Sequence, residues 1–200
     1  MISRFFSFKT RHEFIKIKKK FKMKVIKTKI KGLKVIKQDN YKDKRGNLKV
    51  TFNKKKINFT NFVFDYCTST KGKVVRGFHF QSKFQQAKYV NVVKGKVLDC
   101  VVDLRRNSKT FGKSFKIILS ESNCLGLFIP AGFAHAYYSF DKLNIIYYKL
   151  SNYYKPKFED GIKWNDKDLK IKWPIEKPTI SAKDKKLGTF KNFLSKYKYL

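Results

Sequence analysis

From Met23 onward, the chain is a series of short runs of β-branched and aromatic residues, each bounded by turn residues such as Gly, Asn and Asp. Residues of these types fit a pleated, half-buried surface, so each run predicts a β-strand. Many short strands at close spacing are typical of a sandwich or a closed barrel. We therefore predict an all-β fold with strands at residues 24–30, 33–36, 48–52, 59–64, 89–93, 96–103, 114–119, 125–129, 136–140 and 144–150.

The connections between these runs carry their own signals. Lys94-Gly95 predicts a hairpin turn between two of the strands, and Asp43-Lys44-Arg45-Gly46 predicts another turn. The segment 155–185 contains three prolines and predicts an irregular C-terminal wrap, with one helical turn near residues 165–169. Residues 189–200 predict a short basic helix or a frayed tail.

The pattern divides the chain into three parts. Residues 1–22 are basic and aromatic and lack a secretory cleavage site, so we expect an N-terminal extension outside the domain. A basic amphipathic surface helix, or an early start codon with Met23 as the true start, are the alternatives. We expect the folded domain over residues 23–186 and a basic C-terminal tail over residues 187–200.

The formal net charge of +34 suggests a polyanionic partner. However, only six of the 48 basic residues are arginine, and the lysines are spread along the whole chain. Readers of nucleic acid depend on arginine for bidentate and stacking contacts. We therefore expect neither a nucleic-acid nor a membrane partner, and a basic polyanion-binding barrel without catalysis stays as an alternative.

The three cysteines show no CxxC spacing, which fits a reducing, cytoplasmic compartment. No run of 18 apolar residues is present, so we expect no membrane span.

Histidine is scarce, and only His79 and His135 lie in the strand-rich region. In a regular strand His79 and Gln81 share one face, and a bulge at Gly77 would change which face Arg76 takes. Two histidines cannot build the three-histidine metal site common in barrels, so we expect no metal. A histidine without a metal can act as a general base if a carboxylate from elsewhere in the fold orients it.

Several blocks of the sequence, in order from about Met23 to Asp184, carry a resemblance to a known family. They are Arg76-Gly77-Phe78-His79-Phe80-Gln81, Gln86-Ala87-Lys88, Val101-Val102-Asp103-Leu104-Arg105-Arg106, Ser108-Lys109-Thr110-Phe111-Gly112, Ile129-Pro130-Ala131-Gly132-Phe133-Ala134-His135, Trp164-Asn165-Asp166, Ile171-Lys172-Trp173-Pro174 and Ser181-Ala182-Lys183-Asp184. With these blocks the chain resembles the dTDP-4-dehydrorhamnose 3,5-epimerase family.

The resemblance implies a cupin-type jelly-roll barrel with short peripheral helices, a homodimer, and no metal or cofactor. It implies an isomerase that inverts C3 and C5 of dTDP-4-dehydro-6-deoxy-D-glucose, giving dTDP-4-dehydro-L-rhamnose for dTDP-rhamnose biosynthesis. The 4-keto group of such a nucleotide sugar acidifies the protons at C3 and C5. The reaction then needs a base, an acid on the opposite face of the ring, and a donor beside the enolate oxygen.

Carried over residue by residue, the resemblance implies a role for each matching position. His79 matches the base, Asp184 its orienting carboxylate and Tyr148 the proton donor, while Lys88 matches the residue beside the keto oxygen. Matches to substrate-binding positions are Arg45, Arg76, Gln81, His135, Tyr154, Glu159 and Lys183, with Tyr154 matching an aromatic that stacks on the nucleotide.

Two positions depart from the family pattern. Val50 stands where a Glu is usual, and Phe64-Asp65-Tyr66 stands where Gln-x-Asn is usual. Both features usually serve the nucleotide end of the site. The alternative is therefore a 3- or 5-epimerase that acts on a different nucleotide-linked 4-keto sugar.

Overall fold

The computed structural model describes residues 22–198 and residue 200, and it consists mainly of strands. The expected extension 1–22 lies outside the described residues except for Lys22. The strands are β1 (Lys24–Lys27), β2 (Lys34–Lys37), β3 (Asn40–Asp43), β4 (Gly46–Lys49), β5 (Phe64–Lys71), β6 (Val75–Gln81), β7 (Lys88–Lys94), β8 (Lys96–Asp103), β9 (Ser114–Ser120), β10 (Leu125–Ile129), β11 (Phe133–Ser139), β12 (Leu143–Leu150) and β13 (Glu159–Gly161). The helical segments are the 3₁₀ turn η2 (Pro156–Phe158), α1 (Ala182–Lys185) and α2 (Phe190–Lys196).

Two antiparallel sheets make the body of the molecule. One has the strand order β1-β2-β10-β7-β12-β5 and the other the order β13-β6-β11-β8-β9. Apolar side chains from both sheets, including Val90, Val101 and Ile146, form a buried cluster between them. This arrangement follows from the alternating apolar pattern, because one face of each strand must be buried against the other sheet. The expected all-β fold with short peripheral helices is confirmed.

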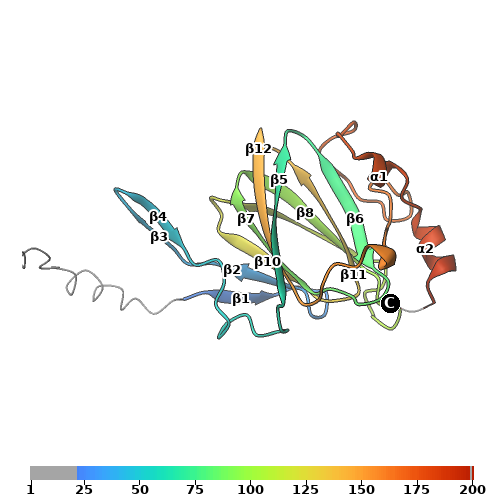
Figure 1. Cartoon of the computed structure of the whole chain (residues 1–200), viewed down its shortest axis with the longest axis horizontal. Coiled ribbons are helices and arrows are strands. Elements are labelled where there is room, and N and C mark those ends of the chain that lie inside the picture. Colours follow the sequence, from blue (N-terminus) through green and yellow to red (C-terminus); the bar gives the residue numbers. More distant parts are fainter. Residues whose placement is uncertain (1–21, 199) are drawn as a thin grey trace, which may run out of the picture.

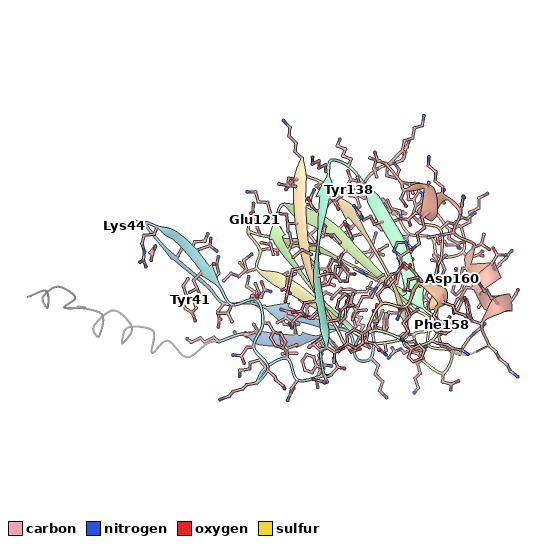
Figure 2. All side chains as sticks on the ribbon, in the orientation of Figure 1. Tyr41, Lys44, Glu121, Tyr138, Phe158 and Asp160 are labelled. Atoms are coloured by element: carbon pink, nitrogen blue, oxygen red, sulfur yellow. The ribbon has the colours of Figure 1, made fainter. Side chains whose placement is uncertain are left out.

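The short hairpin of β3 and β4 reaches away from the body, whereas α1 and α2 lie on the opposite side of the molecule (Figure 1). Lys44 marks the tip of this hairpin in Figure 2, and the neighbouring Arg45 is exposed there and pairs with Asp43 at 2.8 Å. The expected turn at residues 43–46 is therefore present, between two strands that pair directly.

The prediction of a hairpin at Lys94-Gly95 is wrong. The chain does turn there, but β7 and β8 belong to different sheets, so the turn carries the chain from one sheet to the other. Gly95 has φ +81°, and a Cβ at this position would lie 2.6 Å from the carbonyl oxygen of Leu143. Gly95 correctly predicted a tight turn of the chain. A glycine does not indicate which strands pair, so the predicted pairing of the two flanking strands was wrong.

Two further segments differ from the sequence expectations. Residues 59–63 precede β5 instead of forming a strand, and Phe59 and Phe62 pack on Phe128 with ring centroids 4.9 and 6.4 Å away. Residues 165–169 form turns and no helical segment. There, the Asp166 carboxylate accepts the backbone N–H of Leu169, which gives the chain an alternative to helical hydrogen bonds.

The C-terminal segment, which the sequence sets apart as a tail, packs against the barrel in the structure. Phe193 of α2 is 3% exposed and lies edge-on to Phe80 of β6, with ring centroids 5.5 Å apart. Helix α2 begins with a capping box in which Thr189 and Asn192 bond each other's backbone N–H groups. Neither α1 nor α2 has the length or the apolar run that a membrane-spanning helix needs.

Candidate active site

A cavity of about 190 Å³ opens between the two sheets. Its walls come from β5, β7 and β12 on one side and from β6 and β11 on the other. The lining side chains are Tyr66, Thr68, Arg76, His79, Lys88, His135, Tyr137 and Tyr148. A smaller cavity of about 80 Å³ shares three of these residues, Tyr66, His79 and Lys88, and adds Phe80, Gln81, Gln86, Tyr154 and Glu159.

His79 is bonded to Asp184, the carboxylate that the family resemblance implies as its partner. The ring nitrogen Nε2 lies 2.7 Å from Oδ1 of Asp184, whose side chain is 3% exposed. An ionised carboxylate accepts the proton of Nε2, which leaves Nδ1 of the ring as the basic nitrogen. His79 itself is 29% exposed and lines both cavities, so its ring is accessible from the space between the sheets.

Asp184 reaches this position because the C-terminal segment runs along the edge of β6. Isolated bridges join Val74 to Thr179 and Ile162 to Gly188 on either side of α1. Oδ2 of Asp184 accepts the backbone N–H of Gly77 at 3.2 Å. Burial alone would raise the pKa of the Asp184 carboxyl, but the bonds from His79 and Gly77 outweigh it and hold the pKa below its ordinary value.

The register of β6 changes at Gly77. His79 pairs with His135 of β11, but Arg76 pairs with Tyr137, which indicates a bulge between them. The bulge brings Arg76 and His79 to the same cavity. A Cβ on Gly77 would lie 2.4 Å from the carbonyl oxygen of His135, and φ is +109° there, so only glycine fits.

Tyr148 lies on β12, in the sheet opposite to His79, and is 3% exposed. Burial raises the pKa of its phenol well above the ordinary value, and nearby Tyr137, Tyr66 and Asp99 add to the rise. The phenol therefore carries its proton at neutral pH. A base on one sheet and a protonated phenol on the other can act on opposite faces of a ring held between them.

Lys88 lies on β7 and lines both cavities. Burial lowers the pKa of its amine to about 8, although Glu159 and Asp99 act in the other direction. At neutral pH the side chain is mostly a cation with a reduced affinity for its proton. Such a group can stabilise a negative oxygen that forms beside it.

The predicted substrate-binding residues differ in how close they lie to the cavities and in what their polar atoms bond. Glu159 accepts bonds from Tyr154 and Lys183 at the smaller cavity, and these bonds hold its pKa below the ordinary value although burial would raise it. The Gln81 side chain lines this cavity, but its polar atoms bond the backbone of Phe84, Tyr153 and Lys155. The structure does not bring Arg45 to the cavity, because this residue lies in the turn of the β3–β4 hairpin, next to Lys44, which Figure 2 labels.

His135 has a buried carboxylate partner that sequence reasoning missed. Its Nε2 lies 2.8 Å from Oδ2 of Asp99, and both side chains are at most 5% exposed. Oδ1 of Asp99 is buried, and no group in the described part of the chain bonds it. Asp99 lies on β8, two positions in register from His135 across the β8–β11 pair. Only the strand register, which the sequence does not show, could have identified this pair.

Within the described residues, no group of three or more His, Cys, Asp or Glu side chains could hold a metal ion. The expectation of a site that uses neither metal nor cofactor stays a prediction.

A model of the dTDP-4-dehydrorhamnose 3,5-epimerase family matches residues 27–192. The chain belongs to the dTDP-4-dehydrorhamnose 3,5-epimerase family. The enzyme of this name from Methanothermobacter thermautotrophicus is 38% identical over 80% of this chain and 90% of its own length. The predicted family and enzyme class, an isomerase, are therefore confirmed.

Solved structures of the family agree with the fold. A dTDP-4-dehydrorhamnose 3,5-epimerase from Bacillus anthracis, with TDP and PPi bound, is 35% identical, with a TM-score of 0.81 over 84% of this chain and 99% of that chain. The dTDP-6-deoxy-D-glucose-3,5-epimerase of Legionella pneumophila, in complex with dTDP-4-keto-L-rhamnose, is 36% identical, with a TM-score of 0.80 over 84% and 92% of the two chains. The cupin-type jelly roll implied by the resemblance is thus the fold that this epimerase family shares.

Proposed function

We propose that this chain inverts C3 and C5 of dTDP-4-dehydro-6-deoxy-D-glucose and gives dTDP-4-dehydro-L-rhamnose. The bond between His79 and Asp184 at the cavity supports this proposal most directly, because it supplies an oriented base where the family chemistry needs one. The opposed position of Tyr148 adds the acid. We further propose that the jelly-roll domain spans residues 23–186, with α2 of the C-terminal tail packed on it as part of the same folded unit. We also propose that the protein is cytoplasmic, since its three cysteines are free thiols.

In the proposed reaction, Nδ1 of His79 removes the proton at C3 or C5 of the sugar. The electron pair of the C–H bond forms an enolate, whose negative charge collects on the oxygen at C4. The Lys88 ammonium stabilises this oxygen, and Tyr148 gives its proton to the carbon from the opposite face. Solvent then returns a proton to Tyr148 and takes the one on His79, so no net proton is gained or lost.

Charged groups at the two cavities suit the nucleotide end of the substrate. Arg76 lines the larger cavity, and Lys183 lies against Glu159 at the smaller one. A diphosphate prefers arginine, which can bond two oxygens at once. Tyr154 is 48% exposed beside this cavity, so its ring is available to stack on a base.

We also propose a homodimer in which Arg45 serves the cavity of the second copy. The β3–β4 hairpin reaches outward from its own barrel (Figure 1), and Arg45 is the one predicted site residue that its own chain keeps away from the described cavity. In a twofold dimer the two copies make the same contacts with each other, so each copy would supply its Arg45 to the cavity of the other.

A second candidate is an epimerase that inverts one carbon or accepts another nucleotide sugar. The aromatic side chains of Phe64 and Tyr66, where the family usually has Gln and Asn, favour it, because Tyr66 lines both cavities and the ring of Phe64 lies 5.9 Å from that of Tyr66. The third candidate, a barrel that binds polyanions without catalysis, would need no paired base and acid.

Incubation of the purified protein with dTDP-4-keto-6-deoxyglucose in D2O separates these candidates. Deuterium at both C3 and C5, read by NMR, is the result expected of the proposed function. Deuterium at one carbon alone would favour the second candidate. Folded protein that exchanges neither proton of any keto-sugar nucleotide would contradict both enzymatic candidates.

A further inference from the structure

A row of four aromatic rings leads to the cavity, which its members Tyr66 and Tyr148 line. It begins at Tyr153, continues through Phe64 and Tyr66 of β5 and ends on Tyr148 of β12. The ring centroids of successive members are 6.1, 5.9 and 4.8 Å apart. Two of these residues, Phe64 and Tyr66, are the ones that depart from the family pattern. The departure therefore builds a continuous aromatic surface that ends on the proposed proton donor.

The contact between Tyr66 and Tyr148 is fixed by strand pairing. The two residues are direct partners in the antiparallel register of β5 and β12, so their side chains project from the same face of the sheet. Their rings are stacked with an angle of 25° between the planes. The ring of His135 lies edge-on to Tyr148 with centroids 6.1 Å apart. Tyr66 and His135 therefore both restrict the ring of the donor.

Tyr66 also separates Tyr148 from solvent. Strand β5 is at the edge of its sheet, and beyond β12 it pairs with no other strand of the described residues. Tyr66 is 37% exposed, whereas Tyr148 beneath it is 3% exposed. A smaller side chain at position 66 would uncover the donor ring and leave space into which it could rotate.

The position of the donor matters for one half of the reaction more than for the other. Removal of the proton at C3 or C5 depends on His79 and Lys88, on the β6 and β7 strands. Inversion also requires that a proton reach the carbon from the other face, and a displacement of about 1 Å in a reacting group can cost roughly 10²-fold in rate. Looser packing of Tyr148 should therefore reduce inversion and spare exchange.

We propose that Tyr66 is a positioning residue that holds Tyr148 in place by ring stacking, and that it thereby controls inversion in preference to proton abstraction. The inference rests on the proposed function, because it assigns Tyr148 the role of proton donor. The hydroxyl group of Tyr66 has no part in it. Burial raises the pKa of this phenol to about 12, so Tyr66 stays neutral over the working range.

The test compares Tyr66→Asn, which removes the ring, with Tyr66→Phe, which keeps it. Exchange at C3 and C5 in D2O and formation of the inverted sugar are measured by NMR on the same samples. In Tyr66→Asn, we expect exchange within about threefold of the unsubstituted protein and inversion reduced roughly 10- to 100-fold. Tyr66→Phe should retain both. Cys67→Asn is the matched control, since it places the same residue on the same edge strand at an exposed position.

A double-mutant cycle with Tyr148→Phe separates positioning from a general weakening of the barrel. If Tyr66 acts through Tyr148, then Tyr66→Asn should lower inversion by less than about threefold once the Tyr148 hydroxyl is absent. A full additional loss in the double variant would contradict the proposal. So would an equal loss of exchange and inversion in Tyr66→Asn, or no loss of either.

Two controls keep the result decisive. If Tyr66→Asn does not fold, Tyr66→Thr replaces it, because threonine favours strands and also lacks a ring. If the unsubstituted protein exchanges neither proton, the proposed function fails and the inference fails with it. Normal activity in the unsubstituted protein with no selective loss in the variants would contradict the role of Tyr66 alone.

Discussion

The carboxylate that orients His79 comes from a residue 105 positions later in the chain. Residue type could identify His79 as a candidate, because histidine is scarce in the strand-rich region, although strand β6 that carries it was not among the predicted strands. It could not supply Asp184, since nothing local links a helical turn near the C-terminus to β6. Only the family resemblance gave this partner, and the geometry agrees with it.

The family resemblance did not identify Asp99 as the partner of His135. It is one of several charged residues on a predicted strand, and its bond to His135 depends on how β8 and β11 are aligned. Both groups are buried, and a carboxylate removed from water is destabilising unless it is bonded, so the bond from His135 is needed to keep Asp99 inside the fold. Strand register is a property of the whole sheet, so the sequence held no signal for this pair.

Lys88 gives a prediction for the dependence of activity on pH. The pKa of its amine in the folded protein is about 8, below the ordinary value of 10.5, so the ammonium loses its proton as pH rises through about 8. If the cation stabilises the enolate, kcat/KM should fall above this pH. We expect Lys88→Arg, which stays charged, to move this basic limb upward by more than one pH unit in a pH–rate profile.

The lowered pKa of Lys88 also predicts the direction in which stability changes with pH. Between pH 8 and 10.5 the unfolded chain binds the proton of Lys88 and the folded chain does not, so the contribution of this group to stability rises with pH over that window.

For the pH–rate profile, a basic limb of kcat/KM at the same pH in Lys88→Arg as in the unsubstituted protein would show that another group controls the activity.

At the scale of elements, strand positions were easier to predict than strand partners. The predicted strand at residues 125–129 matches β10, and the strand at residues 96–103 matches β8. The turn at Gly95 was also correct, but it joins two sheets instead of two paired strands. A glycine in a turn reports local backbone geometry, and the pairing of strands is decided by contacts distant in the chain.

Helix α2 gives a prediction for stability. Its Phe193 is 3% exposed and packs on Phe80, Phe190 and Tyr197 with ring centroids 5.5 to 5.8 Å away. We expect Phe193→Ala to lower the free energy of unfolding by about 3–5 kcal/mol, measured by urea denaturation. Leu194→Ala, at a position 36% exposed, is the matched control and should change it by less than about 1 kcal/mol. A change below 1 kcal/mol in Phe193→Ala would mean that α2 is not part of the folded unit.

At the scale of the whole molecule, the net charge of +34 misleads if it is taken as a sign of function. Basic side chains project around the whole outline in Figure 2 and do not gather on one visible side. A field of this kind still attracts an anionic substrate from solution, because the charges sum at a distance. The bond between His79 and Asp184, with Tyr148 on the opposite sheet, supports a function more specifically than the charge does.

The proposed homodimer is tested by mixing two inactive variants. In a hybrid of Arg45→Ala with His79→Ala, one cavity would combine an intact His79 with the Arg45 of its partner. Random mixing of subunits should then restore roughly a quarter of the unsubstituted activity, since half of the dimers are hybrids with one intact site each. If Arg45 serves the cavity of its own chain, the mixture should stay inactive.

If His79 removes the sugar protons, the exchange rate of the His79→Ala variant should show it. In D2O with dTDP-4-keto-6-deoxyglucose, we expect the variant to lose deuterium uptake at C3 and C5 by at least about 10³-fold, because the side chain of His79 is 29% exposed whereas that of His135, the other carboxylate-paired histidine of the cavity, is 5% exposed. Its circular dichroism and thermal midpoint should stay close to those of the unsubstituted protein. Deuterium uptake at an undiminished rate in the folded variant would contradict the assignment of His79 as the base.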